Sequence, residues 1–364
     1  MKLEKGVFTN AQLVFLIMSL IQCMILTVNF NYSITKEDTW IAILVAFVIS
    51  IPMALVYTSI AQQFAGKNLV QINDAVFGSY VGKLFSVLYI WFFFQLLVHY
   101  LYYFNSFWIT FIMPETPRII FLVMAIFICA FAIKCGIEVI ARCNVLFVFL
   151  VVFMVLAVSF LMIKDMKFSN LQPLLQSSPK DFIQSVHIIL SIGILDVVGM
   201  LMIFPYALNN DKLRKPMLLA ITLTVALSLI VVLRDTLVLG VRAYTSTSAS
   251  FAISREINIA DVFSRLDILV ALILLISAGT KITLFYYATI LSTAQTLKLR
   301  SYQPLIMPVG ALAVAIAVKL YSSDMAQVYA AEFIWPFNAS FYEIILPLIT
   351  LIVMAIRKSP KKEE

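Results

Sequence analysis

The feature that most constrains this chain is a series of ten apolar runs, each about as long as a helix that crosses a bilayer. Such a helix needs about 20 mostly apolar residues. The runs lie at 9–30, 40–61, 84–112, 119–136, 145–163, 184–207, 216–240, 267–291, 304–320 and 337–356. Because 62% of the 364 residues are hydrophobic and the mean hydropathy is +1.00, this apolar surface could not be hidden in one soluble core. The sequence therefore predicts an all-α membrane protein with ten transmembrane helices.

The segments between the runs are short and collect most of the charge. The stretch 61–83 is too polar to span a membrane, and we expect it to form a helix at the membrane interface. The longest connections, 164–183 and 241–266, are predicted to lie on the same side. No small-x-small cleavage pattern ends the first run, so we expect it to be retained as a span rather than removed as a signal peptide. We therefore predict one polytopic membrane domain over residues 1–364.

The distribution of Lys and Arg predicts the orientation. Lys and Arg are more numerous in the connecting segments that lie on the same side of the membrane as the N-terminus. The C-terminal tail 357–364 is also basic. Positive residues are retained on the cytoplasmic side of membrane proteins. Both termini are therefore predicted to be cytoplasmic, and the net charge of +7 needs no nucleic acid partner to explain it.

Motifs that carry enzyme chemistry are missing from the sequence. There is no phosphate-binding loop, dinucleotide fingerprint, nucleophile elbow or HExxH pattern, and the two histidines, His99 and His187, lie on different runs. The four cysteines have neither metal-ligand spacing nor a secreted disulfide pattern. We expect a protein that is not an enzyme and that needs no metal or cofactor.

The informative residues are ionisable groups inside the runs, because such groups are costly in lipid and face a cavity or a partner. Arg234 and Asp235 lie about 27 Å along a helix from Pro216, which is compatible with the outer headgroup level. Glu343 is near the start of its run and is predicted to be interfacial, and His187 is expected to make a satisfied polar contact.

Lys281 is different because it lies near the middle of its run, 14 residues after Asp267 and 17 before Lys298. Snorkelling does not easily carry an ammonium group that far. Its side chain must therefore face protein or water, as a structural counter-charge to a site or as a titrating group.

The sixth run contains the stretch SIGILDVVGML, residues 191–201, in which Gly193 and Gly199 flank Asp196. Glycine weakens a helix, and backbone groups released by an unwound turn cannot be satisfied by lipid. One interpretation is a broken helix that lines a cavity. The other is a close-packing seam with Asp196 in a polar pocket between helices.

The first run has a weaker counterpart in SLIQCMILTVN, residues 19–29. The first and sixth runs each open a set of five, and paired interruptions at corresponding positions indicate an inverted-repeat binding site near the midplane. We place the repeats at about 9–163 and 184–356. The N-termini of half-helices could hold a carboxylate and the exposed carbonyls an ammonium, a geometry that suits an amino acid.

The third run is strongly aromatic. Leu96, His99, Tyr100 and Tyr103 fall on one helical face and could wall a pocket, although an aromatic stripe is more often ordinary packing. Gln95 and His99 need polar partners in either case.

Short motifs along the whole chain resemble the B subunit of GerA-type spore germinant receptors, in the amino acid-polyamine-organocation transporter superfamily. The motifs are TNAQ at 9–12, DTWI at 38–41, ETP at 115–117, FPYAL at 204–208, SRLD at 264–267 and LPLITLIVMAIRK at 346–358. The resemblance implies a LeuT/APC-like 5+5 inverted repeat with the first and sixth spans interrupted. It also implies a germinant sensor in the inner membrane of a spore, or in the cell membrane, that works with a large A subunit and a lipoprotein C subunit.

Folds of that superfamily bind their ligand among the first, third, sixth and eighth spans. The matching candidates for ligand binding here are Gln22, Cys23, Leu96, His99, Tyr100, Gly193, Ile194, Leu195, Asp196, Thr280 and Lys281. The sequence departs from the family in the first run, since no glycine occurs between Gly6 and Gly66. The prediction is a receptor subunit that binds a small molecule, with an amino acid permease as the alternative.

Overall fold

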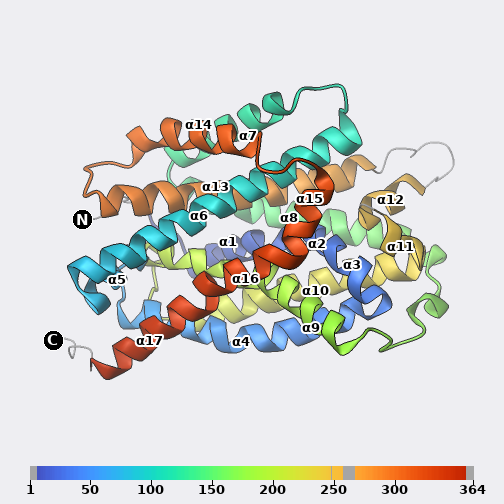
Figure 1. Cartoon of the computed structure of the whole chain (residues 1–364), viewed down its shortest axis with the longest axis horizontal. Helices are drawn as coiled ribbons and strands as arrows, with labels where there is room; N and C mark the ends of the chain where they lie inside the picture. Colours follow the sequence, from blue (N-terminus) through green and yellow to red (C-terminus); the bar gives the residue numbers. More distant parts are fainter. Residues whose placement is uncertain (1–5, 247, 257–266, 358–364) are drawn as a thin grey trace.

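The helices of the protein run alongside one another in one bundle (Figure 1). The computed structural model describes residues 6–246, 248–256 and 267–357. Within these residues the chain forms helices and no β-strand, and one isolated bridge joins Phe8 to Ala207. The predicted all-α class is therefore confirmed. The basic tail from residue 358 onward and the loop segment 257–266 lie outside the described residues.

The helices follow the predicted runs in order. The first part of the chain forms α1 (Asn10–Gln22), α2 (Met24–Thr27), α3 (Asn29–Thr35), η1 (Lys36–Asp38), α4 (Thr39–Gln63), α5 (Leu69–Phe77), α6 (Ser79–Phe107), η2 (Trp108–Ile112), α7 (Arg118–Lys134) and α8 (Ile137–Leu161). The second part forms η3 (Ile163–Asp165), η4 (Phe168–Leu171), α9 (Pro179–Ile189), η5 (Leu190–Ile194), η6 (Leu195–Met202), η7 (Phe204–Tyr206), α10 (Arg214–Leu239), α11 (Arg242–Thr245), α12 (Ala249–Glu256), α13 (Asp267–Thr296), η8 (Gln303–Leu305), α14 (Ile306–Ala317), α15 (Asp324–Tyr329), η9 (Ala330–Ile334), α16 (Trp335–Ser340), η10 (Phe341–Ile345) and α17 (Leu346–Ile356).

Most of these helical stretches are long and apolar enough to cross a membrane. By length and composition, seven qualify among the described residues: Asn29–Gln63, Ser79–Ile112, Ile137–Leu161, Pro179–Met202, Arg214–Leu239, Asp267–Thr296 and Asp324–Ile356. The stretches Asn10–Gln22 and Gln303–Ala317 are shorter apolar helices, and α7 has 17 residues. The chain is therefore a multi-pass membrane protein whose helices match the ten predicted spans, called spans 1 to 10 below.

Local sequence explains where several spans begin. Thr9 starts α1 with a capping box, in which its hydroxyl accepts from the amide of Gln12 and the Gln12 side chain accepts from the amide of Thr9. Ser178 caps α9, which has Pro179 in its first turn, where a missing amide hydrogen costs nothing. Gly136, at φ 89°, allows the sharp turn between α7 and α8.

Spans 1 and 6 are interrupted as predicted, but neither is unwound into a loop. Span 1 is divided into α1, α2 and α3 at Cys23 and Val28, both of which keep right-handed helical dihedrals. Span 6 changes from the α-helix α9 to the π-helical η5 and then to the 3₁₀-helical η6. Such changes of helix type shift the backbone hydrogen bonds and often mark functional sites.

Span 10 begins earlier than the sequence predicted. The predicted run is 337–356, whereas the helical stretch extends over Asp324–Ile356 and includes two π-helical segments, η9 and η10. Polar residues such as Gln327, Glu332 and Asn338 lower the hydropathy of its first half. For this reason the predicted boundary placed Glu343 close to the end of the span.

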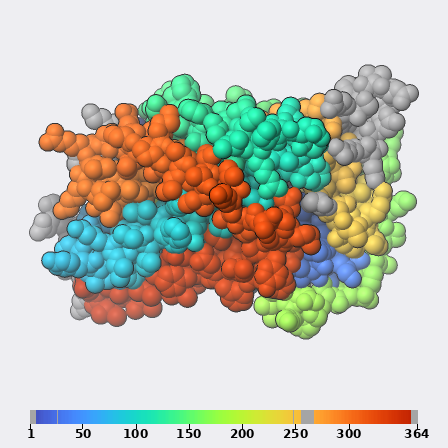
Figure 2. All heavy atoms as spheres, turned by 45° about the horizontal axis from the view of Figure 1, so that its top comes forward, coloured from blue at the N-terminus to red at the C-terminus, as the bar shows by residue number. Residues whose placement is uncertain are grey.

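Span 6 lies at the centre of the bundle. In its most apolar stretch 94% of the residues are buried inside the molecule, against 67% for α13 and 33% for α8. The outer surface is formed by other helices, and Figure 2 shows α7, α14, α16 and α17 together on one face. A change in the backbone of span 6 is therefore transmitted to protein rather than to lipid.

The described parts of the two long connections lie at the same end of the bundle (Figure 1), where the first contacts the last turns of α10. The amide of Lys167 and the side-chain amide of Asn170 both donate to the carbonyl of Leu237, at 3.0 and 2.9 Å. The helices α11 and α12 follow directly after α10 at that end (Figure 1). At the opposite end the short helix α5 packs one face, with Leu69, Ile72 and Val76, against α6.

Candidate functional site

The change of helix type in span 6 leaves a backbone carbonyl available to side chains of two other spans. The carbonyl oxygen of Ile192, in η5, accepts a hydrogen bond from the Tyr100 hydroxyl at 2.7 Å and lies 3.4 Å from the ammonium of Lys281. The sequence predicted that carbonyls freed in this span would hold the ammonium of a ligand. In this structure the ammonium belongs to the chain itself.

Lys281 and Asp196 form an ion pair in the protein interior. Their charged atoms are 2.6 Å apart and both side chains have 0% exposure. The Tyr100 hydroxyl lies 2.8 Å from the same carboxylate oxygen, and the Lys281 ammonium lies 4.1 Å from the centre of the Tyr100 ring. A buried pair of this kind is tolerated when hydrogen bonds and an aromatic face compensate for lost hydration. The Lys281 side chain therefore faces protein rather than lipid and is paired with a carboxylate of span 6.

A third ionisable group completes this centre, and the sequence prediction for it was wrong. Glu343, in η10, has 0% exposure and is not interfacial. Its segment packs against η6, which carries Asp196, and among the described residues neither of its carboxyl oxygens has a hydrogen-bond partner. Because span 10 begins at Asp324, Glu343 lies well inside the span rather than at its end.

The aromatic face of α6 walls a small pocket, which was one of its two predicted interpretations. The pocket has a volume of about 40 Å³ and is lined by Thr27, Phe30, Leu96, His99, Tyr100, Tyr103, Ile192, Tyr321, Gln327, Ala331 and Trp335. At roughly 10–15 Å³ of this volume per water, it holds about three waters. Spans 1, 3, 6 and 10 therefore meet around a pocket too small for an amino acid.

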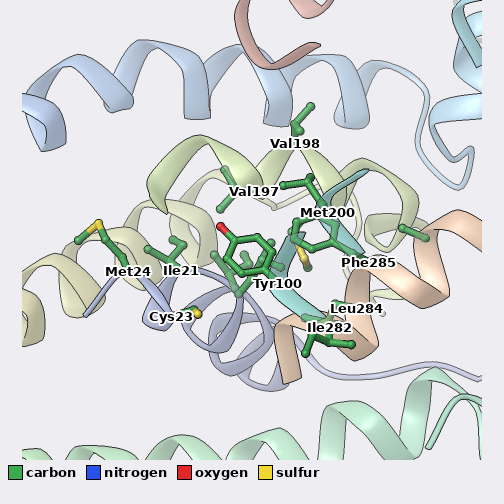
Figure 3. Packing of buried hydrophobic residues seen from close by; sticks show 14 of the residues in the cluster. Ile21, Cys23, Met24, Tyr100, Val197, Val198, Met200, Ile282, Leu284 and Phe285 are labelled. Atoms are coloured by element: carbon green, nitrogen blue, oxygen red, sulfur yellow. The ribbon is translucent and has the colours of Figure 1, made fainter. Parts of the chain in front are cut away.

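Tyr100 separates the pocket from the charged centre. Its ring contributes to the pocket wall, while its hydroxyl reaches Asp196 and Ile192. Figure 3 shows this hydroxyl directed toward the part of span 6 that carries Val197, with Phe285 of α13 beside the ring. The two rings are stacked, with centroids 6.2 Å apart. A shift of Tyr100 would therefore change both the wall of the pocket and the hydrogen bond to Asp196.

Two polar residues that line the pocket, His99 and Tyr321, are fixed by their neighbours. The His99 ring bonds through Nδ1 to the carbonyl of Gln95 at 2.7 Å and packs on Trp335, with centroids 4.3 Å apart. Burial and the neighbouring Tyr102 raise the pKa of Tyr321 to about 12, so its hydroxyl remains neutral. The pocket therefore offers neutral donors and aromatic walls.

A larger hollow lies directly outside the pocket. It has a volume of about 350 Å³ and shares Phe30, Tyr103 and Gln327 with the pocket. Asp324 and Glu332 also line it. We call it the vestibule. The vestibule lies at the end of the bundle that carries α11 and α15, and the shared side chains separate it from the pocket.

The other predicted site residues lie either in the core beside the interruptions of spans 1 and 6 or, for Thr280, at a different cavity. Gln22 and Cys23 are buried where span 1 is interrupted, and a Cβ added to Gly193 would meet the Met24 side chain at 2.7 Å. Ile194 and Leu195 are buried in the core.

Thr280 does not join the other candidates. It lines an apolar cavity of about 440 Å³ between α7, α8 and α13, and its hydroxyl donates to the carbonyl of Ser277. Although it precedes Lys281 in sequence, its side chain lies on a different face of α13.

Sequence reasoning missed several pocket residues. Trp335, Gln327 and Ala331 belong to the first half of span 10, which the predicted boundary excluded. A tryptophan and a glutamine just before an apolar run were the available indication. Phe30 and Tyr321 had no distinguishing pattern.

The remaining intramembrane charges form a second, separate cluster. Arg234 donates through Nε and Nη2 to Oδ1 of Asp235, at 2.9 and 2.6 Å, and both side chains are almost completely buried. Ser250 bridges the pair, since its hydroxyl lies 2.9 Å from Arg234 and 2.6 Å from Oδ2 of Asp235. The predicted position at the outer headgroup level stays a prediction, and the structure adds that the pair is buried within the protein. His187, as predicted, has a polar partner in Ser340, at 2.7 Å.

Comparison with known proteins identifies the family. The family described as spore germination protein matches residues 8–325 of this chain. The chain belongs to the spore germination protein family. Spore germination protein KB of Bacillus subtilis strain 168 is 24% identical over 341 residues, which cover 91% of this chain and 90% of that protein. The predicted resemblance to spore germination receptors is thereby confirmed at the level of the family.

Solved structures confirm the fold of this spore germination family member. MhsT, in complex with L-phenylalanine, superposes with a TM-score of 0.69 at 11% identity and covers 96% of this chain and 99% of that chain. Mhp1, a nucleobase-cation-symport-1 family transporter in a closed conformation with bromovinylhydantoin bound, has a TM-score of 0.64 at 12% identity, covering 98% and 80%. A Na⁺-coupled sialic acid symporter has a TM-score of 0.64 at 11% identity, covering 98% and 91%. The chain therefore has the predicted LeuT/APC-like fold.

Proposed function

We propose that this protein is the membrane-embedded sensing subunit of a spore germination receptor, and that a small germinant binds in the pocket walled by Leu96, His99 and Tyr100. The observation that carries the proposal is a small pocket at the interruptions of spans 1 and 6, in a chain of the spore germination protein family. In folds of this type, interrupted helices near the midplane supply ligand contacts.

The size of the pocket supports a sensor with two conformations. A volume of about 40 Å³ admits water but not an amino acid, so a ligand must bind a more open arrangement. A ligand that prefers that arrangement shifts the equilibrium toward it, by an amount set by its differential affinity. Rocking of one helical bundle against the other is the motion we propose.

The pocket chemistry favours a small amphipathic ligand, most simply an amino acid. Thr27, Tyr321 and Gln327 offer polar groups, and Tyr103 and Trp335 offer aromatic walls. The acidic residues Asp324 and Glu332 at the vestibule would attract the ammonium end of a zwitterion.

Partners and location follow from the same proposal. The subunit would act with a receptor A subunit and a lipoprotein C subunit in the spore inner membrane, with both termini cytoplasmic. In that orientation the vestibule faces away from the cytoplasm, where a germinant arrives.

A pair of substitutions on one helix tests the sensor. Leu96→Phe would fill the pocket, while Val87→Phe adds the same ring to α6 at a position that is 52% exposed. We expect spores with Leu96→Phe to need at least about tenfold more germinant, equal to about 1.4 kcal/mol of binding free energy, and spores with Val87→Phe to respond normally. Germination would be measured across single amino acids, beside spores lacking the gene. Equal responses of the two variants would contradict a germinant site here.

The alternative is an amino acid permease, which the transport proteins among the structural neighbours favour. Uptake of labelled amino acids into proteoliposomes separates the two functions. A sensor predicts binding without accumulation, whereas a permease predicts uptake that Leu96→Phe abolishes and Val87→Phe preserves.

A further inference from the structure

The charged centre contains one cation and two acids, so its charges do not balance. Lys281 is paired with Oδ2 of Asp196. Within the described part of the chain, Oδ1 of Asp196 and both carboxyl oxygens of Glu343 are buried without a hydrogen-bond partner. An uncompensated carboxylate in such a place is strongly unfavourable.

The neighbouring side chains do not supply the missing donor. Tyr57 donates to the backbone carbonyl of Glu343 at 2.5 Å, and Tyr89 donates to the carbonyl of Tyr342 at 3.2 Å. Tyr100 is engaged with Asp196 and Ile192. Cys23, where span 1 is interrupted, is also buried. Among the residues that the structure describes, no side chain donates to a Glu343 carboxyl oxygen.

A single proton would satisfy these requirements together. If Glu343 is a neutral carboxylic acid, its hydroxyl can donate to the free oxygen of Asp196, and the centre then holds one cation and one anion. The segments that carry the two carboxyl groups, η6 and η10, pack against each other. Two adjacent buried carboxyl groups cannot both ionise readily, and they retain a proton between them.

We propose that Glu343 and Asp196 form a binding site for one exchangeable proton, buried between spans 6 and 10. The proton neutralises the centre while the helices are packed as they are here. A movement that separates η6 from η10, or that admits water, would release it. Proton binding therefore favours the closed arrangement. This inference does not depend on which molecule occupies the pocket.

The position of Tyr100 would couple the proton to the pocket. Its hydroxyl bonds to Asp196 while its ring lines the pocket. A ligand that displaces the ring removes a hydrogen bond from Asp196, and this changes how strongly the carboxyl pair retains its proton.

Infrared spectroscopy of the purified full-length protein in lipid nanodiscs tests the proposal. A buried carboxylic acid has a carbonyl stretching band that shifts in D₂O. We expect this band at neutral pH in the wild type, its loss in Glu343→Gln, and its retention in Glu332→Gln, which removes an acid from the same span at the vestibule. Asp196→Asn should also abolish the band, because Glu343 then becomes the carboxylate partner of Lys281.

Two results would overturn the proposal. One is the absence of the band from the wild type, a measurement that requires no variant to fold. The other is its persistence in Glu343→Gln or Asp196→Asn. A titration with NaCl and KCl at fixed pH distinguishes a metal cation from a proton. If either salt raised the thermal stability of the wild type but not that of Glu343→Gln, the site would hold a metal cation instead.

Discussion

Among the residues that the structure describes, two clusters of ionisable groups are buried, and they are built differently. In the cluster of Arg234, Asp235 and Ser250, one cation meets one anion and both carboxylate oxygens have hydrogen-bond partners. In the cluster of Lys281, Asp196 and Glu343, two acids share one cation and three oxygens lack a partner. The first cluster is complete in itself, whereas the second can still accept a proton.

This difference separates structural charges from responsive ones. Burial alone does not distinguish the clusters, since both are shielded from solvent. The number of charges and the number of satisfied oxygens distinguish them. The incomplete cluster also lies beside the pocket, through Tyr100, whereas the complete one packs α12 against α10.

The largest effect is expected from Lys281→Met, which leaves two buried acids without a cation. We expect it to lower the free energy of unfolding by about 5 kcal/mol, the upper end for breaking a buried ion pair. Thermal or denaturant unfolding in detergent would measure this. Lys83→Met, at an exposed position of α6, is the control. A similar stability for the two variants would mean that Lys281 is not the counter-charge.

Arg234→Met is expected to cost about 3 kcal/mol, the lower end for a buried ion pair, because Asp235 keeps two hydroxyl partners, Ser250 and Tyr32. Adding Asp235→Leu should recover most of the loss, since a complete pair can be replaced by apolar residues. The same unfolding assay applies. Failure of the double variant to recover would show that this pair has a role beyond charge balance.

Tyr100→Phe and Tyr32→Phe compare the two clusters through matched hydroxyl groups. We expect Tyr100→Phe to cost about 2 kcal/mol, because a buried acceptor loses a short hydrogen bond. Tyr32 lies 3.4 Å from Asp235, so Tyr32→Phe should cost about 0.5 kcal/mol. A reversed order in unfolding measurements would contradict the view that Tyr100 holds the incomplete centre.

Gly193→Ala should lower the free energy of unfolding by about 1 kcal/mol, because a methyl group there crowds the flexible side chain of Met24. Gly279 has open space where its Cβ would be, so Gly279→Ala is the control and should not destabilise. We expect only Gly193→Ala to alter the germinant dose response, since it separates spans 1 and 6. Identical dose responses would argue against that contact as part of the switch.

Much of the fold could be predicted from the sequence because lipid imposes a simple rule. Backbone groups in hydrocarbon must be satisfied within a helix, so length and hydropathy locate the spans. The rule failed for span 10, where the polar side chains of Gln327 and Glu332 line the vestibule. That boundary error is the reason Glu343 was expected at the interface.

The candidate site was predicted residue by residue but not as an arrangement. Lys281, Asp196 and Tyr100 stood out singly, because each is a polar or ionisable group in an apolar run. Their mutual distances could not be inferred, since they lie on three different helices. Thr280 also shows that position in sequence does not give spatial arrangement. Its neighbour Lys281 faces the charged centre, whereas Thr280 lines the apolar cavity between α7, α8 and α13.

By itself the sequence determined that the chain crosses the membrane as helices, and which of its residues would be costly there. Only the tertiary structure decided which charges face one another, that the freed carbonyl of Ile192 holds the chain's own ammonium, and that two acids share it. The physical reason is range: hydropathy accumulates along a helix, whereas the balance of buried charges depends on atoms brought within a few ångströms by packing.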